Sequence, residues 1–102
     1  MSRPRPHEAH RRINAEIAQE KAAALGRAGE RLEAALEVVA TLGRRLDVTR
    51  DAEARARLLG EDEDARARAL HARLALLIQR EAIGLRQHRS VDATYPAPPR
   101  RS

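Results

Sequence analysis

The sequence predicts an all-α protein built as a long antiparallel helical hairpin. Ala and Leu supply most of the 42% of residues that are apolar, and Tyr95 is the only aromatic residue. Both Ala and Leu favour helices, whereas strands are enriched in aromatic and β-branched residues. Apolar residues also recur at helical spacing over two long stretches. A chain of 102 residues has room for one small domain.

The first helical stretch runs from about His7 to Leu46, and its apolar residues fit a heptad seam. The members of one line are Ala18, Leu25, Leu32, Val39 and Leu46, and those of the other are Lys21, Ala28, Ala35 and Leu42. Alternation of large with small residues lets a neighbouring helix approach closely. The pattern stays in phase across Gly26 and Gly29, which predicts one long helix.

The connection between the two stretches is predicted to lie between Gly43 and Asp51. Gly43 is placed to stop the first helix, and Thr49 is placed to cap the second, ahead of acidic residues in its first turn. Such a short connection joins antiparallel neighbours.

The second helical stretch runs from about Arg50 to Arg89 and contains Gly60, followed by the acidic run 61–64. Two outcomes are open. The helix continues through Gly60, or it ends there and the acidic run begins a new helix, where negative charge suits the N-terminus. Acid–base pairs at four-residue spacing, such as Asp62 with Arg66, indicate that the run is a solvated helix face and not a cation site.

The second stretch also carries an apolar face that is too wide for one partner helix. The expected interaction face consists of Leu70, Leu74, Leu77, Ile78 and Leu85. A neighbouring stripe holds Ala65, Ala69, Ala72, Leu76 and Ile83. This stretch should therefore pack against at least two neighbours, whereas a hairpin supplies one. We expect a homodimer that completes a four-helix bundle, or a different protein partner.

Two charged residues, Lys21 and Glu81, interrupt the apolar stripes. A hairpin that turns near residue 49 brings the two arm ends together, and burial of Glu81 alone would be costly. We therefore expect Glu81 to form a buried polar pair near Lys21 or Asn14 that fixes the register. A catalytic carboxylate is the alternative role for Glu81, although no nucleophile or second acid converges on it.

The two chain ends are expected to lie outside a hairpin domain of residues 7–89. Residues 1–6 are expected to form a disordered basic N-terminus, and residues 90–102 a Pro-rich tail that is extended or disordered, because proline cannot continue a helix. The ends carry the whole formal charge of +5, since basic and acidic residues balance between residues 13 and 88. The folded body therefore offers no basic groove, which argues against nucleic acid as a partner.

Several kinds of chemistry lack their residues in this sequence. The chain has no cysteine, which excludes disulfides, thiolate nucleophiles and cysteine zinc sites. It also has no phosphate-binding loop, no nucleophile with its base and no histidine spaced for a di-iron bundle, so no enzyme activity, metal or cofactor is expected. The apolar runs are too short to span a membrane and no secretory signal is evident, which indicates a cytoplasmic protein.

The stretch from Ile17 to Leu36, followed by Gln79 to Arg86 and a Tyr-Pro tail, resembles a family of short bacterial helical proteins, a domain of unknown function. The resemblance implies a bacterial cytoplasmic protein and no site residues. The function expected from the sequence is a self-associating protein–protein interaction module without catalytic activity, which works by binding another protein. The alternative is an accessory protein that binds nucleic acid or an anionic surface through its Arg-rich termini.

Overall fold

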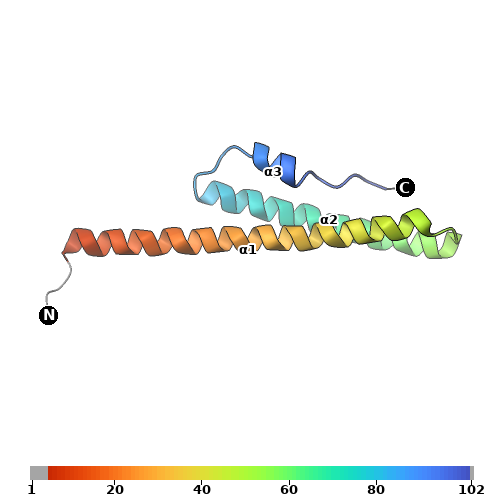
Figure 1. Ribbon diagram of the computed structural model, residues 1–102, viewed down its shortest axis with the longest axis horizontal. Helices are drawn as coiled ribbons and strands as arrows, with labels where there is room; N and C mark the ends of the chain where they lie inside the picture. Colours follow the sequence, from red (N-terminus) through yellow and green to blue (C-terminus); the bar gives the residue numbers. More distant parts are fainter. Residues whose placement is uncertain (1–4, 102) are drawn as a thin grey trace.

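The computed structural model describes residues 5–101 and shows two long helices packed against each other, followed by a short third helix (Figure 1). Helix α1 spans Pro6–Val48, α2 spans Ala52–Ala82 and α3 spans Arg89–Thr94. No strand occurs among the described residues, so the prediction of an all-α hairpin is confirmed. Most of the predicted N-terminal segment 1–6 lies outside the described residues, and its last residue already begins α1.

Helix α1 is one continuous helix of 43 residues. Proline is favoured at the start of a helix, where its missing N–H leaves no bond unmade, and Pro6 occupies that position. The backbone N–H of Arg5 donates to Glu8 Oε2 at 3.3 Å, which ties the first turn together. Gly26 and Gly29 lie in open space within the helix and do not break it, as the unbroken heptad pattern predicts.

The turn between the long helices is shorter than predicted, because α1 does not stop at Gly43 but continues to Val48. Asp51 caps α2 in place of Thr49: its Oδ2 accepts a hydrogen bond from the backbone N–H of Ala54 at 2.9 Å. The Thr49 hydroxyl instead faces back along α1 and donates to the Arg45 carbonyl at 2.6 Å.

Helix α2 runs without interruption through Gly60, which decides between the two outcomes that the sequence leaves open. It ends at Ala82, well before the predicted Arg89. Gly84 adopts a left-handed conformation with φ of 91°. The Leu85 amide donates to the Arg80 carbonyl at 2.9 Å and the Gly84 amide to the Glu81 carbonyl at 3.0 Å. These two bonds form a Schellman motif, which terminates the helix.

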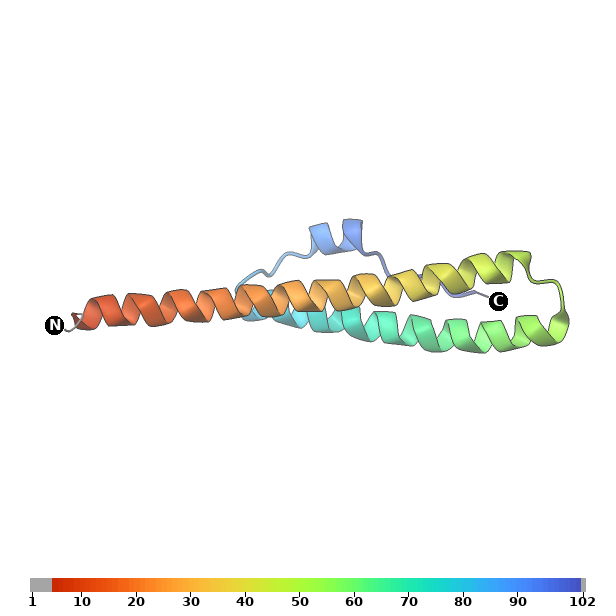
Figure 2. The same ribbon diagram turned by 60° about the horizontal axis from the view of Figure 1, so that its bottom comes forward.

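The hydrophobic core lies along the seam of the two long helices in two clusters. The cluster nearer the turn contains Leu42, Leu46, Leu58 and Ala65. The second cluster contains Ala28, Leu32, Leu76 and Val91. The predicted seam is therefore buried in its later part, whereas Ala18 and Lys21 remain exposed. Both line a groove with Ala82 at the end of α2. Beyond this point α1 continues without α2 beside it, as Figures 1 and 2 show.

The C-terminal segment folds back over the hairpin (Figure 2). The expected extended or disordered tail is wrong for its first part, residues 90–94, which belong to α3 (Arg89–Thr94). Helix formation is favoured there because Val91 enters the core cluster with Leu32 and Leu76. Beyond α3 the chain returns toward the hairpin turn, where Arg101 Nη1 donates to Asp47 Oδ1 at 3.1 Å. The chain itself thus supplies a second neighbour for α2.

Candidate interaction surfaces

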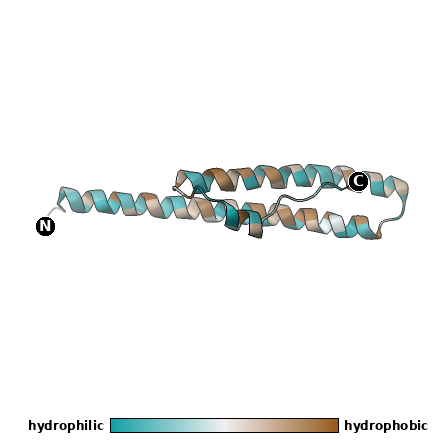
Figure 3. Cartoon of the chain, turned by 90° about the horizontal axis from the view of Figure 1, so that it is seen from above, coloured by the Kyte–Doolittle hydropathy of each residue, from teal (hydrophilic) through white to brown (hydrophobic). Residues whose placement is uncertain are grey.

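The outer side of α2 carries an exposed apolar stripe, which we call the α2 face. It consists of Leu70, Leu74 and Ile78 on α2 and of Leu85 just beyond the end of this helix, and their exposed fractions lie between 41% and 56%. Leu77, the remaining residue of the expected face, is half-buried and packs against the core cluster that contains Val91. Figure 3 shows hydrophobic bands along the length of α2.

The α2 face stays uncovered because of its position around the helix. Ala69 is fully buried in the hairpin. At 100° per residue, Leu74 and Ile78 lie about 140° and 180° around the helix from Ala69, so they point away from α1. Leu70, Leu74 and Ile78 follow at intervals of four residues and therefore form one continuous stripe.

The projecting part of α1 exposes further apolar side chains, Ile13 and Ile17. A shallow groove of about 480 Å³ lies where this part meets the end of α2. Its lining includes Asn14, Lys21, Ala82 and Ile83. Because residues of both helices line this groove, α1 and the end of α2 lie side by side there, as expected for a hairpin.

Lys21 and Glu81 do not form a buried pair, because both side chains are exposed. Glu81 Oε1 instead lies 3.1 Å from His88 Nε2. The reason is local: the left-handed turn at Gly84 folds the following residues back over the last turn of α2, which brings His88 to Glu81. The sequence contains this signal in the form of a glycine after a helical stretch.

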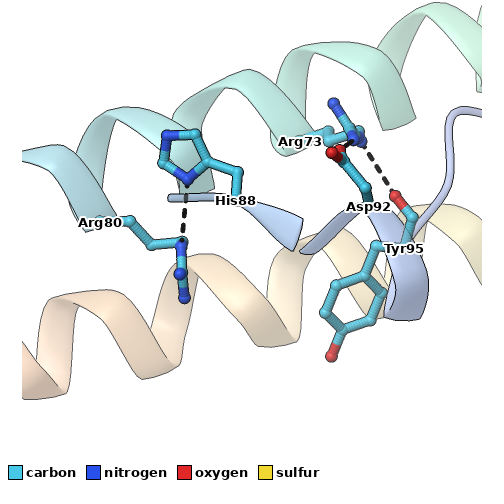
Figure 4. Close-up of polar contacts among 5 residues, drawn as sticks. All are labelled: Arg73, Arg80, His88, Asp92 and Tyr95. Atoms are coloured by element: carbon cyan, nitrogen blue, oxygen red, sulfur yellow. Dashed lines mark hydrogen bonds and ion pairs between the residues drawn. The ribbon is translucent and has the colours of Figure 1, made fainter. Parts of the chain in front are cut away.

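His88 is held by two residues of α2. Arg80 Nε donates to His88 Nδ1 at 3.3 Å (Figure 4). Since Nδ1 accepts, Nε2 carries the proton and donates to Glu81. Arg80 Nη2 also donates to the Gln87 carbonyl at 2.9 Å. These bonds fasten the end of α2 to the loop before α3.

Helix α3 is anchored to both long helices. Arg73 of α2 forms an ion pair with Asp92, and its Nε donates to the Tyr95 carbonyl at 2.9 Å (Figure 4). The Tyr95 hydroxyl donates to Glu33 of α1. This hydrogen bond, followed by desolvation and by the charge of Glu33, raises the pKa of Tyr95 above its ordinary value. The sequence interpretation missed this anchor, although Val91 and Tyr95 are spaced by one helical turn.

The acidic run on α2 is only partly a solvated face. Glu61, Glu63 and Asp64 are exposed as predicted, but Asp62 is 2% exposed. Its Oδ1 and the Nε of Arg66 are buried and have no hydrogen-bond partner among the described residues. The interpretation of Asp62 as solvated is therefore wrong, because the position faces the seam.

Two further properties bear on function. Within residues 5–101, no three His, Asp or Glu side chains gather closely enough to bind a metal ion. No helix in that range combines the length and apolar character needed to traverse a bilayer.

No protein-family model, curated protein or solved structure matches the chain. The function is therefore inferred from the surfaces of the chain.

Proposed function

We propose that this protein is a self-associating interaction module that has no catalytic activity and works by binding another protein through the α2 face. The observation that carries the proposal is the exposure of Leu74 and Ile78, at 55% and 56%, on a helix whose opposite side is already buried in the hairpin. Apolar stripes of this kind on a folded protein commonly mark an interaction surface.

Burial of the α2 face supplies the energy for such binding. Removal of a Leu or Ile side chain from water contributes about 1.5–3 kcal/mol when burial is complete, and Leu70, Leu74 and Ile78 are each about half-exposed. Their joint burial therefore contributes several kcal/mol, before the cost of association. A helical stripe with four-residue spacing fits an apolar helix of the partner.

The non-catalytic part of the proposal is supported by how the polar residues are used. Arg80, Glu81 and His88 bond to one another and to the backbone at the end of α2. Arg73 and Asp92 likewise hold α3 in place. These side chains serve the fold of the C-terminal segment.

The proposed binding is tested by comparing proteins captured from the native cells by the wild-type chain and by the double variant Leu74→Gln/Ile78→Gln. A matched control is Val48→Gln, which alters an exposed apolar side chain beside the turn. We expect a protein that the wild-type chain and the control retain and that the double variant loses, with unchanged helix content by circular dichroism. Capture of the same proteins by all three chains would contradict the proposal.

A further inference from the structure

Helix α3 and the tail cover one side of the hairpin seam and leave the other side bare. The Tyr95 hydroxyl donates to Glu33 of α1, which is next to the fully buried Leu32 in the sequence. At 100° per residue, Glu33 lies on one side of Leu32 and Val38 lies on the other. Val38 is accordingly exposed, on the side that α3 does not reach.

The bare side of α1 carries a regular stripe, which we call the α1 stripe. It consists of Ile13, Ile17, Glu20, Arg31 and Val38, all exposed. Eighteen residues make about five helical turns, so Ile13 lies in line with Arg31, and Glu20 in line with Val38. The seven-residue step from Ile13 to Glu20 is about 20° short of two full turns, so the two lines lie about 20° apart around the helix.

The charges on this stripe are separated along the helix and unpaired. Within the described part of the chain, neither Glu20 nor Arg31 has an ion-pair partner. They are about 16 Å apart along a straight helix, which is too far for them to reach each other. Glu20 and Arg31 therefore do not neutralise each other within one copy of the chain.

A second copy in antiparallel orientation would neutralise both charges. The alignment that sets Ile13 opposite Val38 of the second copy also sets Glu20 opposite Arg31 and Ile17 opposite Ala34. Two-fold symmetry makes each of these pairs twice. A parallel alignment in register would instead set Glu20 against Glu20, which is repulsive.

The surface at the receiving end has a shape that suits this docking. A hollow of about 250 Å³ is lined by Ala34, Ala35 and Val38 of α1 and by Ala65 and Arg68 of α2. Small side chains let a neighbouring helix come close, and the projecting Ile17 of the second copy is a large apolar group opposite Ala34. Charge, spacing and shape thus favour the same occupant.

We propose that two copies of this chain associate through antiparallel α1 stripes, with Ile13 against Val38 and Glu20 against Arg31. This arrangement rests on the self-association in the proposed function. It leaves the α2 face available for another protein. Leu70 lies near the side of α2 on which Arg73 holds α3, whereas Arg68, which lines the hollow for the second copy, lies on the opposite side of α2.

The arrangement is tested by cross-linking the double variant Ile13→Cys/Val38→Cys, because the natural chain has no cysteine. The two positions are about 37 Å apart on one α1, so they cannot form a disulfide within a chain. We expect oxidation to give covalent dimers of the double variant, and of an equal mixture of the two single variants. Each single variant alone should give none.

Charge reversal gives a second readout that needs no new bond. We expect Glu20→Arg to weaken the dimer at least tenfold in sedimentation equilibrium, since it sets arginine against Arg31 twice. Arg31→Glu should do the same, and the double variant Glu20→Arg/Arg31→Glu should restore association. The control Glu30→Arg makes the same charge change at a position about 80° around the helix from Glu20, and it should leave the dimer unchanged.

The outcomes separate the two proposals. A wild-type chain that stays single at every concentration would overturn both the self-association and this arrangement. A stable dimer that neither cross-links through positions 13 and 38 nor responds to Glu20→Arg would overturn the α1 arrangement alone. Circular dichroism of each variant, with unchanged helix content, establishes that the loss of association is not a loss of folding.

Discussion

The guanidinium group of Arg101 lies over the backbone of Gly43. A Cβ atom on Gly43 would stand 2.6 Å from Arg101 Nη2, which is closer than packed atoms approach. From this position Arg101 Nη1 donates to Asp47 at 3.1 Å. The absence of a side chain at Gly43 thus lets the C-terminal tail lie against the last part of α1.

We predict that Gly43→Ala releases the end of the tail without unfolding the protein. The flexible end of Arg101 can move away, and the exposed ion pair that is lost contributes at most about 1 kcal/mol. Alanine gains up to about 1 kcal/mol over glycine within a helix, so the free energy of unfolding should change little. Limited trypsin digestion should cleave after Arg100 faster than in the wild-type chain. An unchanged cleavage rate would show that Gly43 does not position the tail.

The end of α2 depends on the left-handed backbone at Gly84. We predict that Gly84→Ala lowers the free energy of unfolding by about 1–2 kcal/mol, because residues with a Cβ are strained at this φ of 91°. The matched control is Gly60→Ala, which lies in open space within α2 and should raise stability by up to about 1 kcal/mol. Urea titration of both variants measures the difference. Equal effects at the two positions would contradict the Schellman ending.

Asp62 buries a carboxylate oxygen that has no hydrogen-bond partner among the described residues. We predict that Asp62→Ala raises the free energy of unfolding by about 1 kcal/mol or more, because it removes an unsatisfied buried group and adds a better helix former. Asp64→Ala, at an exposed position of the same run, should change stability by less than about 0.5 kcal/mol. Thermal unfolding compares the two variants. Clear destabilisation by Asp62→Ala would mean that the carboxylate has a favourable role.

The attachment of α3 should weaken at high pH. The hydrogen bond to Glu33, with desolvation and the charge of Glu33, raises the pKa of Tyr95 above 10.0, so the fold favours the neutral phenol. The contribution of Tyr95 is complete below pH 10.0 and is lost as the pH rises through the raised pKa. Ultraviolet titration of this single tyrosine should show the raised pKa, and Glu33→Ala should lower the pKa toward its ordinary value. Identical titrations of the two chains would rule out the contact.

The long-range order of the fold follows from apolar spacing alone. The seam residues Leu32 and Leu46 are buried as the heptad predicts, since a repeat that stays in phase over many turns has one favourable way to pack. The expected interaction face is also largely exposed in the single chain. Periodicity is a property of the whole helix and is little affected by single residues.

Single residues account for what the sequence did not predict. Gly43 has the pattern of a helix stop, but in the structure it makes room for the side chain of Arg101, which is far away in the sequence. The prolines in residues 90–102 led to the prediction of an extended or disordered tail. Burial of Val91 in the core orders the segment that precedes these prolines. Asp62 belongs to an acidic run, and only the rotation of α2 places it in the seam. Each of these depends on a tertiary neighbour that local pattern does not specify.

Self-association is tested most directly by the mass of the pure wild-type chain in solution, measured by sedimentation equilibrium over a wide range of dilution. We predict a mass of twice 11.4 kDa at micromolar concentration, which falls toward that of the single chain as the protein is diluted. A mass of 11.4 kDa at every concentration, with full helix content, would contradict self-association and the role proposed for it.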